Sequence, residues 1–154
     1  MIRVKLTLGM AVAGACAITM LSAGGASAGG GFSKRSIRGT YASTFQGSVI
    51  ESSSLLPVNG TAIFTADGKG NISGHESFVF NGTICTDVAS TGTYTVNKDG
   101  SGTTSFTFTG STSACSGTYT QNLAIAESGR IIVLNNTNTA NQISETWRQQ
   151  GSPP

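Results

Sequence analysis

The chain has 154 residues, of which 10% are charged, 38% are hydrophobic and 21 are glycine. This length is enough for one small domain and excludes a second one. The formal net charge of +2 is carried by Arg3 and Lys5 near the start of the chain, and the basic and acidic side chains of the remainder balance. Nothing in the sequence supplies the basic stripe that phosphate contacts require, so a nucleic-acid partner is not expected.

Residues 1–28 have the pattern of a secretory signal peptide. A basic start is followed by an apolar run from Leu6 to about Leu21 and by the Ala-x-Ala motif at Ala26-Ser27-Ala28. Cleavage after Ala28 would release a secreted or periplasmic protein. Lipidation at Cys16 is the alternative interpretation. The apolar run is too diluted by Gly, Ser and Thr for a transmembrane anchor, which needs roughly 20 apolar residues.

Residues 29–36 show no periodicity and are predicted to form a flexible N-terminal arm. The first strand follows, because Tyr41, Phe45 and Val49 are apolar while polar residues lie between them. This period of two is typical of a strand with one buried face. A loop is expected over residues 51–56, before Pro57.

Turn signals divide the rest of the chain into hairpins. Asp67-Gly68, Asn81-Gly82 and Asp99-Gly100 each stand between alternating segments, and the phrase that begins Gly92-Thr93-Tyr94 repeats the one that begins Gly60-Thr61. Such dipeptides favour tight hairpin turns. The predicted strands are Val58–Ala66, Asn71–Phe80, Thr83–Asn97, one around Phe106 and Phe108, one through Tyr119 and Leu123, Ile131–Asn135 and Gln142–Arg148.

The predicted strand Thr83–Asn97 is longer than a normal strand. Its apolar face is formed by the even positions Ile84, Val88, Tyr94 and Val96. A bulge or bend is therefore expected near residues 90–92.

These elements predict an all-β fold, a single antiparallel up-and-down (meander) barrel of about eight strands over residues 37–150, with a tail at 151–154. A meander with one apolar face buries that face by closing on itself, which also removes exposed edges. A membrane barrel needs apolar residues on its outer face, whereas the alternate face here is rich in Thr and Ser. Membrane insertion of the mature chain is therefore not expected.

An exported meander of this length resembles the calycin-type barrels, which include lipocalins, avidins and allene-oxide-cyclase-like proteins. Lipocalins begin their first strand with Gly-x-Trp under a basic residue of the last strand, and this chain has Gly39-Thr40-Tyr41 and Trp147-Arg148. Avidin-like chains share the turn seen at Ala66-Asp67-Gly68, but they line the biotin site with several tryptophans. The resemblance implies a hollow or filled barrel interior as the place of function.

Two cysteines, Cys85 and Cys115, remain after the signal peptide. In an exported protein, a disulfide between them is the expected state. A metal site is not expected, because the sequence has a single histidine, His75, on a polar strand face. No cofactor is expected.

Two carboxylates stand on apolar strand faces. Glu76 shares its face with Phe78 and Phe80, and Glu145 shares its face with Trp147. A carboxylate in such surroundings must be paired, hydrogen-bonded or neutral, and perturbed groups tend to mark functional sites. The alternative is that each lies at a strand end near water or pairs with Arg148 or Arg38.

The favoured function is the binding of a small lipophilic ligand in the barrel interior, without catalysis. The predicted ligand-binding residues are Tyr41, Glu76, Phe78, Phe80, Phe106, Phe108, Glu145 and Trp147. One alternative is a cyclase- or isomerase-type enzyme that uses Glu76 or Glu145 as a general base. Another is an interaction or protease-inhibitor module with a filled barrel. The sequence identifies neither the ligand nor the oligomeric state.

Overall fold

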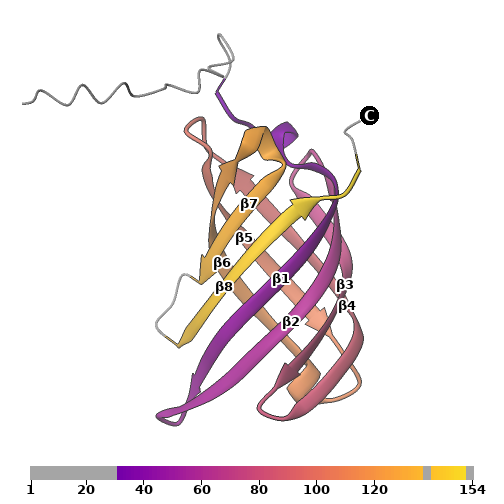
Figure 1. Cartoon of the computed structure of the whole chain (residues 1–154), viewed down its shortest axis with the longest axis vertical. Coiled ribbons are helices and arrows are strands. Elements are labelled where there is room, and N and C mark those ends of the chain that lie inside the picture. Colours follow the sequence, from indigo (N-terminus) through magenta and orange to yellow (C-terminus); the bar gives the residue numbers. More distant parts are fainter. Residues whose placement is uncertain (1–30, 137–139, 152–154) are drawn as a thin grey trace, which may run out of the picture.

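A computed structural model of the protein describes residues 31–136 and 140–151. The predicted signal peptide, the start of the arm and the last residues of the tail lie outside these ranges. Eight strands form one closed barrel in which each strand pairs with its neighbours in the sequence and β1 pairs with β8 (Figure 1). All the pairings are antiparallel, so the predicted all-β meander barrel is confirmed.

The strands are joined by tight turns and three short 3-10 helices. In chain order the elements are η1 (Lys34–Ser36), β1 (Arg38–Glu51), β2 (Ser54–Asp67), β3 (Asn71–Phe80), β4 (Thr83–Val96), β5 (Ser101–Thr109), η2 (Ser113–Cys115), β6 (Ser116–Ala126), η3 (Glu127–Gly129), β7 (Ile131–Asn136) and β8 (Asn141–Gln149). No helix among the described residues has the length and apolar character needed to cross a bilayer.

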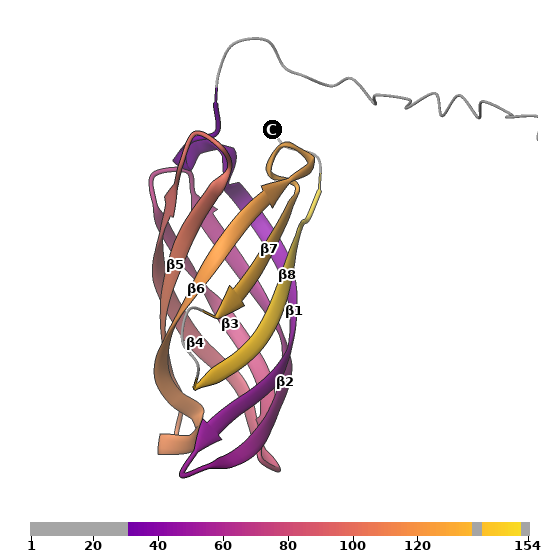
Figure 2. The same ribbon diagram turned by 90° about the vertical axis from the view of Figure 1, so that its left-hand side faces the viewer.

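The two ends of the barrel carry different structures (Figures 1 and 2). One end, here called the arm end, holds η1, η3 and the turns β2–β3 and β4–β5. The other, here called the cavity end, holds η2 and the hairpin turns β1–β2 and β3–β4. Both the described residues before β1, 31–37, and the end of β8 lie at the arm end.

The predicted loop over residues 51–56 is wrong. β1 and β2 continue to a two-residue turn at Ser52-Ser53, with Glu51 paired to Ser54. Both turn residues have positive φ, 49° and 69°. Serine rarely adopts this conformation, and neither Asn-Gly nor Asp-Gly stands at this turn. The sequence therefore contained no signal for the hairpin.

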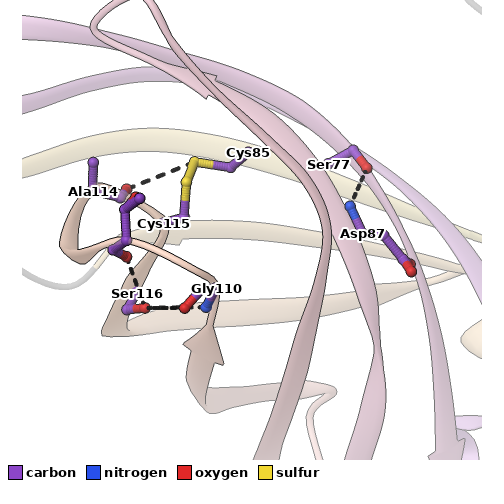
Figure 3. Close-up of a disulfide and its surroundings, with 8 residues drawn as sticks. Ser77, Cys85, Asp87, Gly110, Ala114, Cys115 and Ser116 are labelled. Carbon is purple, nitrogen blue, oxygen red and sulfur yellow. Dashed lines mark hydrogen bonds between the residues drawn. A yellow bond between two sulfur atoms is a disulfide. The ribbon is translucent and has the colours of Figure 1, made fainter.

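The irregularity in β4 was predicted in the wrong place. Val88 pairs with Glu76 but Cys85 pairs with Phe78, so β4 has an extra residue at Thr86-Asp87 rather than near residues 90–92. Asp87 has a φ of 52°, and its backbone N–H donates to Ser77 Oγ (Figure 3). The bulge reverses the alternation that precedes it, so Cys85 points inward.

Because of the same bulge, the predicted inward orientation of Ile84 is wrong. The sequence pattern assigned Ile84 to the apolar face, but its side chain is 75% exposed. The extra residue places Ile84 on the outer face of β4, beside Val79 of β3.

The segment predicted to be a flexible arm contains contacts with the barrel from residue 32 onward. The backbone N–H of Phe32 donates to the carbonyl of Lys98, and the phenol of Tyr94 donates to the carbonyls of Lys34 and Ile37. Ile37 is fully buried, and the Tyr41 phenol donates to the carbonyl of Gly129 in η3. These bonds hold η1 and η3 across the arm end.

The arm half of the interior is packed with side chains. Trp147 lies against the rings of Tyr41, Phe64 and Phe106, with centroid distances of 6.0, 5.5 and 5.8 Å. The buried members of this cluster are Ile37, Tyr41, Ala62, Phe64, Ala66, Ile72, Tyr94, Phe106, Leu123, Ile132, Leu134 and Trp147. None of these buried residues borders the cavity described below.

Candidate functional site

The cavity half of the barrel is hollow. It contains a cavity of about 530 Å³ that lies between the middle of the barrel and the cavity end and opens to solvent. This volume lies within the range of small-molecule sites in proteins, about 300–1,000 Å³. The cavity is bordered by Phe45, Val49, Glu51, Val58, Glu76, Phe78, Phe80, Phe108, Ser113, Ala114, Ser116, Thr118, Tyr119, Asn141, Ile143 and Glu145.

Aromatic rings form much of the apolar wall. Phe78 lies 5.6 Å from Phe108 in an edge-to-face arrangement and 6.3 Å from Phe45, measured between ring centroids. A side chain on Gly60 would collide with both Phe45 and Phe78, so the absence of a Cβ there makes room for the two rings.

The disulfide closes the wall at the cavity end. Cys85 of β4 and Cys115 of η2 are bonded, with a Cα–Cα distance of 5.5 Å, as predicted (Figure 3). The β5–β6 connection is further tied by Ser116, whose hydroxyl bonds both the N–H and the carbonyl of Gly110. Residues 113 and 114, which border the cavity, are thereby fixed to the barrel wall.

Six polar side chains are buried in the interior of the barrel. Ser43, Glu76, Ser90, Thr104, Gln121 and Glu145 come from six different strands, and each is at most 3% exposed. Ser43 Oγ and Trp147 Nε1 donate to Glu145 Oε1 over 2.5 and 2.6 Å, and Ser90 Oγ donates to Glu76 Oε1 over 2.6 Å. We call these six residues the polar belt.

Glu76 and Glu145 belong both to the belt and to the cavity wall. Neither lies at a strand end near water, and the described residues offer no Lys or Arg partner to either, so the alternative placement of these residues does not hold. β3 and β8 are not neighbours in the barrel. The two carboxyl groups therefore border one cavity from separate parts of the barrel wall, and the charge of one acts on the other.

Burial perturbs the ionisation of both carboxyl groups. It raises the pKa of Glu76 to about 7; the hydrogen bond from Ser90 opposes this rise, and the charge of Glu145 adds a smaller one. Burial also raises the pKa of Glu145, against hydrogen bonds from Ser43 and Trp147 and the amide of Gln121. Glu76 is thus poised to gain or lose a proton near neutral pH.

Tyr119 completes the polar end of the cavity. Burial and the charges of Glu145 and Glu76 raise the pKa of its phenol well above 10, so the hydroxyl keeps its proton. This hydroxyl donates to no other described residue, whereas the ring stacks on Phe106 of the packed half at 5.2 Å. The phenol is therefore a fixed donor that remains free for a ligand.

The predicted site residues divide between the two halves. Glu76, Phe78, Phe80, Phe108 and Glu145 border the cavity. Tyr41, Phe106 and Trp147 lie in the packed half, where Trp147 touches the site only by donating to Glu145. His75 lies outside the barrel, 61% exposed and 3.1 Å from Asp87.

The sequence pattern did not identify Phe45, Val49, Val58, Tyr119 and Ile143 as cavity residues. The strand pattern places Phe45 and Val49 on the buried face of the first strand, but alternation does not distinguish a hollow half from a packed half. The sequence did contain one signal for a polar region in the interior, because Ser43, Ser90 and Gln121 are polar residues at inward positions.

Comparison with known proteins gives no match to a family model, to a curated protein or to a solved structure. The closed antiparallel meander of eight strands is consistent with a calycin-like architecture, and it identifies no family within that group.

Proposed function

We propose that the protein binds a small, largely apolar ligand in the cavity half of the barrel, with the polar end of the ligand at Glu76, Glu145 and Tyr119. The observation that carries this proposal is the cavity of about 530 Å³ in a barrel whose other half is packed. A barrel that served only as a scaffold would fill both halves, because an unfilled apolar cavity costs stability. The cavity favours ligand binding over an interaction module with a filled interior.

Titration with the neutral fluorescent probe N-phenyl-1-naphthylamine tests the proposal. The wild-type protein should bind the probe saturably at one site with enhanced fluorescence. Val58→Trp fills the cavity wall with a large ring and should weaken binding at least tenfold, because Val58 borders the cavity.

Val133→Trp is the matched control, since Val133 is a β-strand valine 41% exposed on the outer surface. It should bind the probe as the wild type does. Equal binding by Val58→Trp and Val133→Trp, or no saturable binding by the wild type, would exclude the cavity as the binding site.

A second candidate is an enzyme that moves a proton next to a carbonyl group, and the pKa of about 7 at Glu76 favours it. In D₂O, the Glu76 carboxylate would take an α-proton from 2-octanone, and a deuteron from solvent would replace it. Proton NMR should then show faster α-exchange with the wild type than with Glu76→Gln. Equal rates in the two proteins would eliminate this candidate.

Export of the protein is also a proposal. The disulfide is compatible with an extracellular location, and the predicted cleavage site supports export through a signal peptide. N-terminal sequencing of the protein from its own host should find Gly29 as the first residue, and a start at Cys16 would instead show a lipoprotein.

A further inference from the structure

The carboxyl groups in the cavity have no partner charge. Glu76 and Glu145 are 3% and 2% exposed, and no Lys, Arg or His borders the cavity among the described residues. A buried carboxylate loses its hydration and needs a compensating charge or several hydrogen bonds. The interior as it stands supplies hydrogen bonds only from Ser43, Ser90 and Trp147, together with the nearby Gln121 amide.

The geometry of those bonds leaves acceptor atoms for a ligand. All three hydrogen bonds reach an Oε1 atom, one on Glu76 and two on Glu145. Each carboxylate oxygen accepts more than one hydrogen bond, and the two Oε2 atoms receive none of these three. An ammonium group has three donors and no acceptor, which matches a site made of two carboxylates.

The rings beside the carboxylates suit a cation as well. Phe45, Phe78, Phe108 and Tyr119 border the same cavity. The face of an aromatic ring attracts a positive charge, and in a desolvated site this attraction reaches about 2 kcal/mol.

The distribution of charged side chains over the barrel also favours a cationic ligand. Every Lys and Arg after residue 30 is exposed at the arm end, on η1, on the turns β2–β3 and β4–β5, after η3, or at the outer ends of β1 and β8. The cavity end has no basic side chain among the described residues, and Glu51 borders the cavity there. Such a separation attracts cations to the cavity end and repels anions from it.

We infer that the ligand of the cavity is a lipophilic amine, whose protonated nitrogen binds between Glu76 and Glu145 against the ring of Tyr119 and whose apolar part lies among Phe45, Phe78 and Phe108. This inference rests on the proposed function and specifies its ligand class. These charges exclude an anionic lipid or a fatty acid as the ligand.

Three probes of one chain length test the inference: n-octylamine, n-octanol and n-octanoate, each used at pH 8 to displace N-phenyl-1-naphthylamine. The amine should bind at least tenfold more tightly than the alcohol, and octanoate should bind more weakly than either. Glu76→Gln and Glu145→Gln should each reduce the ratio of amine to alcohol affinity at least fivefold. Gln keeps the size and an acceptor oxygen of Glu, so both variants are expected to fold.

Glu127→Gln is the matched control, because it removes the same charge from an exposed position in η3 at the arm end. It should leave all three affinities unchanged. Equal affinity of the wild type for amine and alcohol, tighter binding of octanoate, or an amine preference that survives in the Glu76→Gln/Glu145→Gln protein would overturn the inference while the binding cavity stands. Failure of the wild type to bind the fluorescent probe itself would instead remove the proposed function.

Discussion

The ionisation of Glu76 is coupled to folding, because its carboxyl is exposed in the unfolded chain and 3% exposed in the barrel. Its pKa rises from 4.5 to about 7 on folding. A carboxyl group with a raised pKa stabilises the folded state in its protonated form. Its contribution is present below pH 4.5 and is lost as the pH rises through about 7.

We therefore expect the free energy of unfolding to fall by about 3 kcal/mol between pH 4.5 and pH 8 on account of Glu76. Glu145 changes in the same direction, because burial raises its pKa too. Urea unfolding at the two pH values measures the change, and Glu76→Gln should flatten it while Glu127→Gln should not. A pH dependence in Glu76→Gln as steep as that of the wild type would contradict the assignment.

The acidic residues at the turns act in another pH range. Hydrogen bonds from the backbone and side chain of Asn71 and the backbone of Lys69 hold the pKa of Asp67 well below its usual value, and bonds from Ser101 lower that of Asp99. Folded-state pKa values below the unfolded ones support stability above about pH 4, and this support is lost as the pH falls further. It therefore does not mask the change due to Glu76.

Tyr94 ties the segment before β1 to the barrel. Its hydroxyl donates to the carbonyls of Ile37 at 2.7 Å and Lys34 at 2.9 Å. Tyr94→Phe should lower the free energy of unfolding by about 1–3 kcal/mol, because buried backbone acceptors lose their donor.

Tyr119→Phe is the control for that substitution, since the Tyr119 hydroxyl donates to no described residue, and it should change stability by less than about 0.5 kcal/mol. Chemical denaturation of both variants measures the difference. If both variants lost the same free energy of unfolding, the hydrogen bonds of Tyr94 would not be what stabilises the arm end.

At the scale of the elements, β4 and η2 depend on each other through the disulfide. Cys85 points inward only because the bulge at Thr86-Asp87 reverses the strand, and this orientation brings it to Cys115. The crosslink joins residues 30 apart in the chain. On the chain-entropy model such a loop stabilises the fold by about 3–4 kcal/mol.

The variant Cys85→Ala/Cys115→Ala should lose most of that stability. Hydrogen exchange should accelerate in residues 110–116 and in the start of β4, while amides of the packed half keep their relative protection. Thermal unfolding and exchange followed by mass spectrometry measure the two effects. Uniform acceleration over the whole barrel would indicate that the disulfide does not act locally at the cavity end.

At the scale of the whole molecule, the barrel depends on its last strand. β8 pairs with β1 from Tyr41↔Gln149 to Val49↔Asn141, and it also pairs with β7. Without β8, both neighbours would expose unpaired backbone groups and the interior would open to water. Glu145 and Trp147 would be lost with the strand.

A chain that ends at Asn136 should therefore fail to show cooperative unfolding by circular dichroism. A chain that ends at Gln150 keeps β8 and is the control, which should unfold like the full chain. Cooperative unfolding of the shorter chain would mean that seven strands can close the barrel without β8.

The sequence by itself determined the all-β class, the order of the strands, most hairpin turns and the disulfide. These features follow from local information: the period of two along each strand, the turn dipeptides, and a pair of cysteines with a single possible pairing. The turn at Ser52-Ser53 and the bulge at Asp87 escaped prediction because residues other than glycine adopt positive φ there.

Only the tertiary structure decided which half of the barrel is hollow and that Glu76 and Glu145 border the same cavity. Alternation along one strand states which side chains point inward, whereas a cavity depends on the combined volumes of side chains that all the strands bring to one level. Tyr41, Phe106 and Trp147 pack against one another, while Glu76 and Glu145 border the level that stays open. Closure through β1 and β8 sets these levels, and no single strand contains that information.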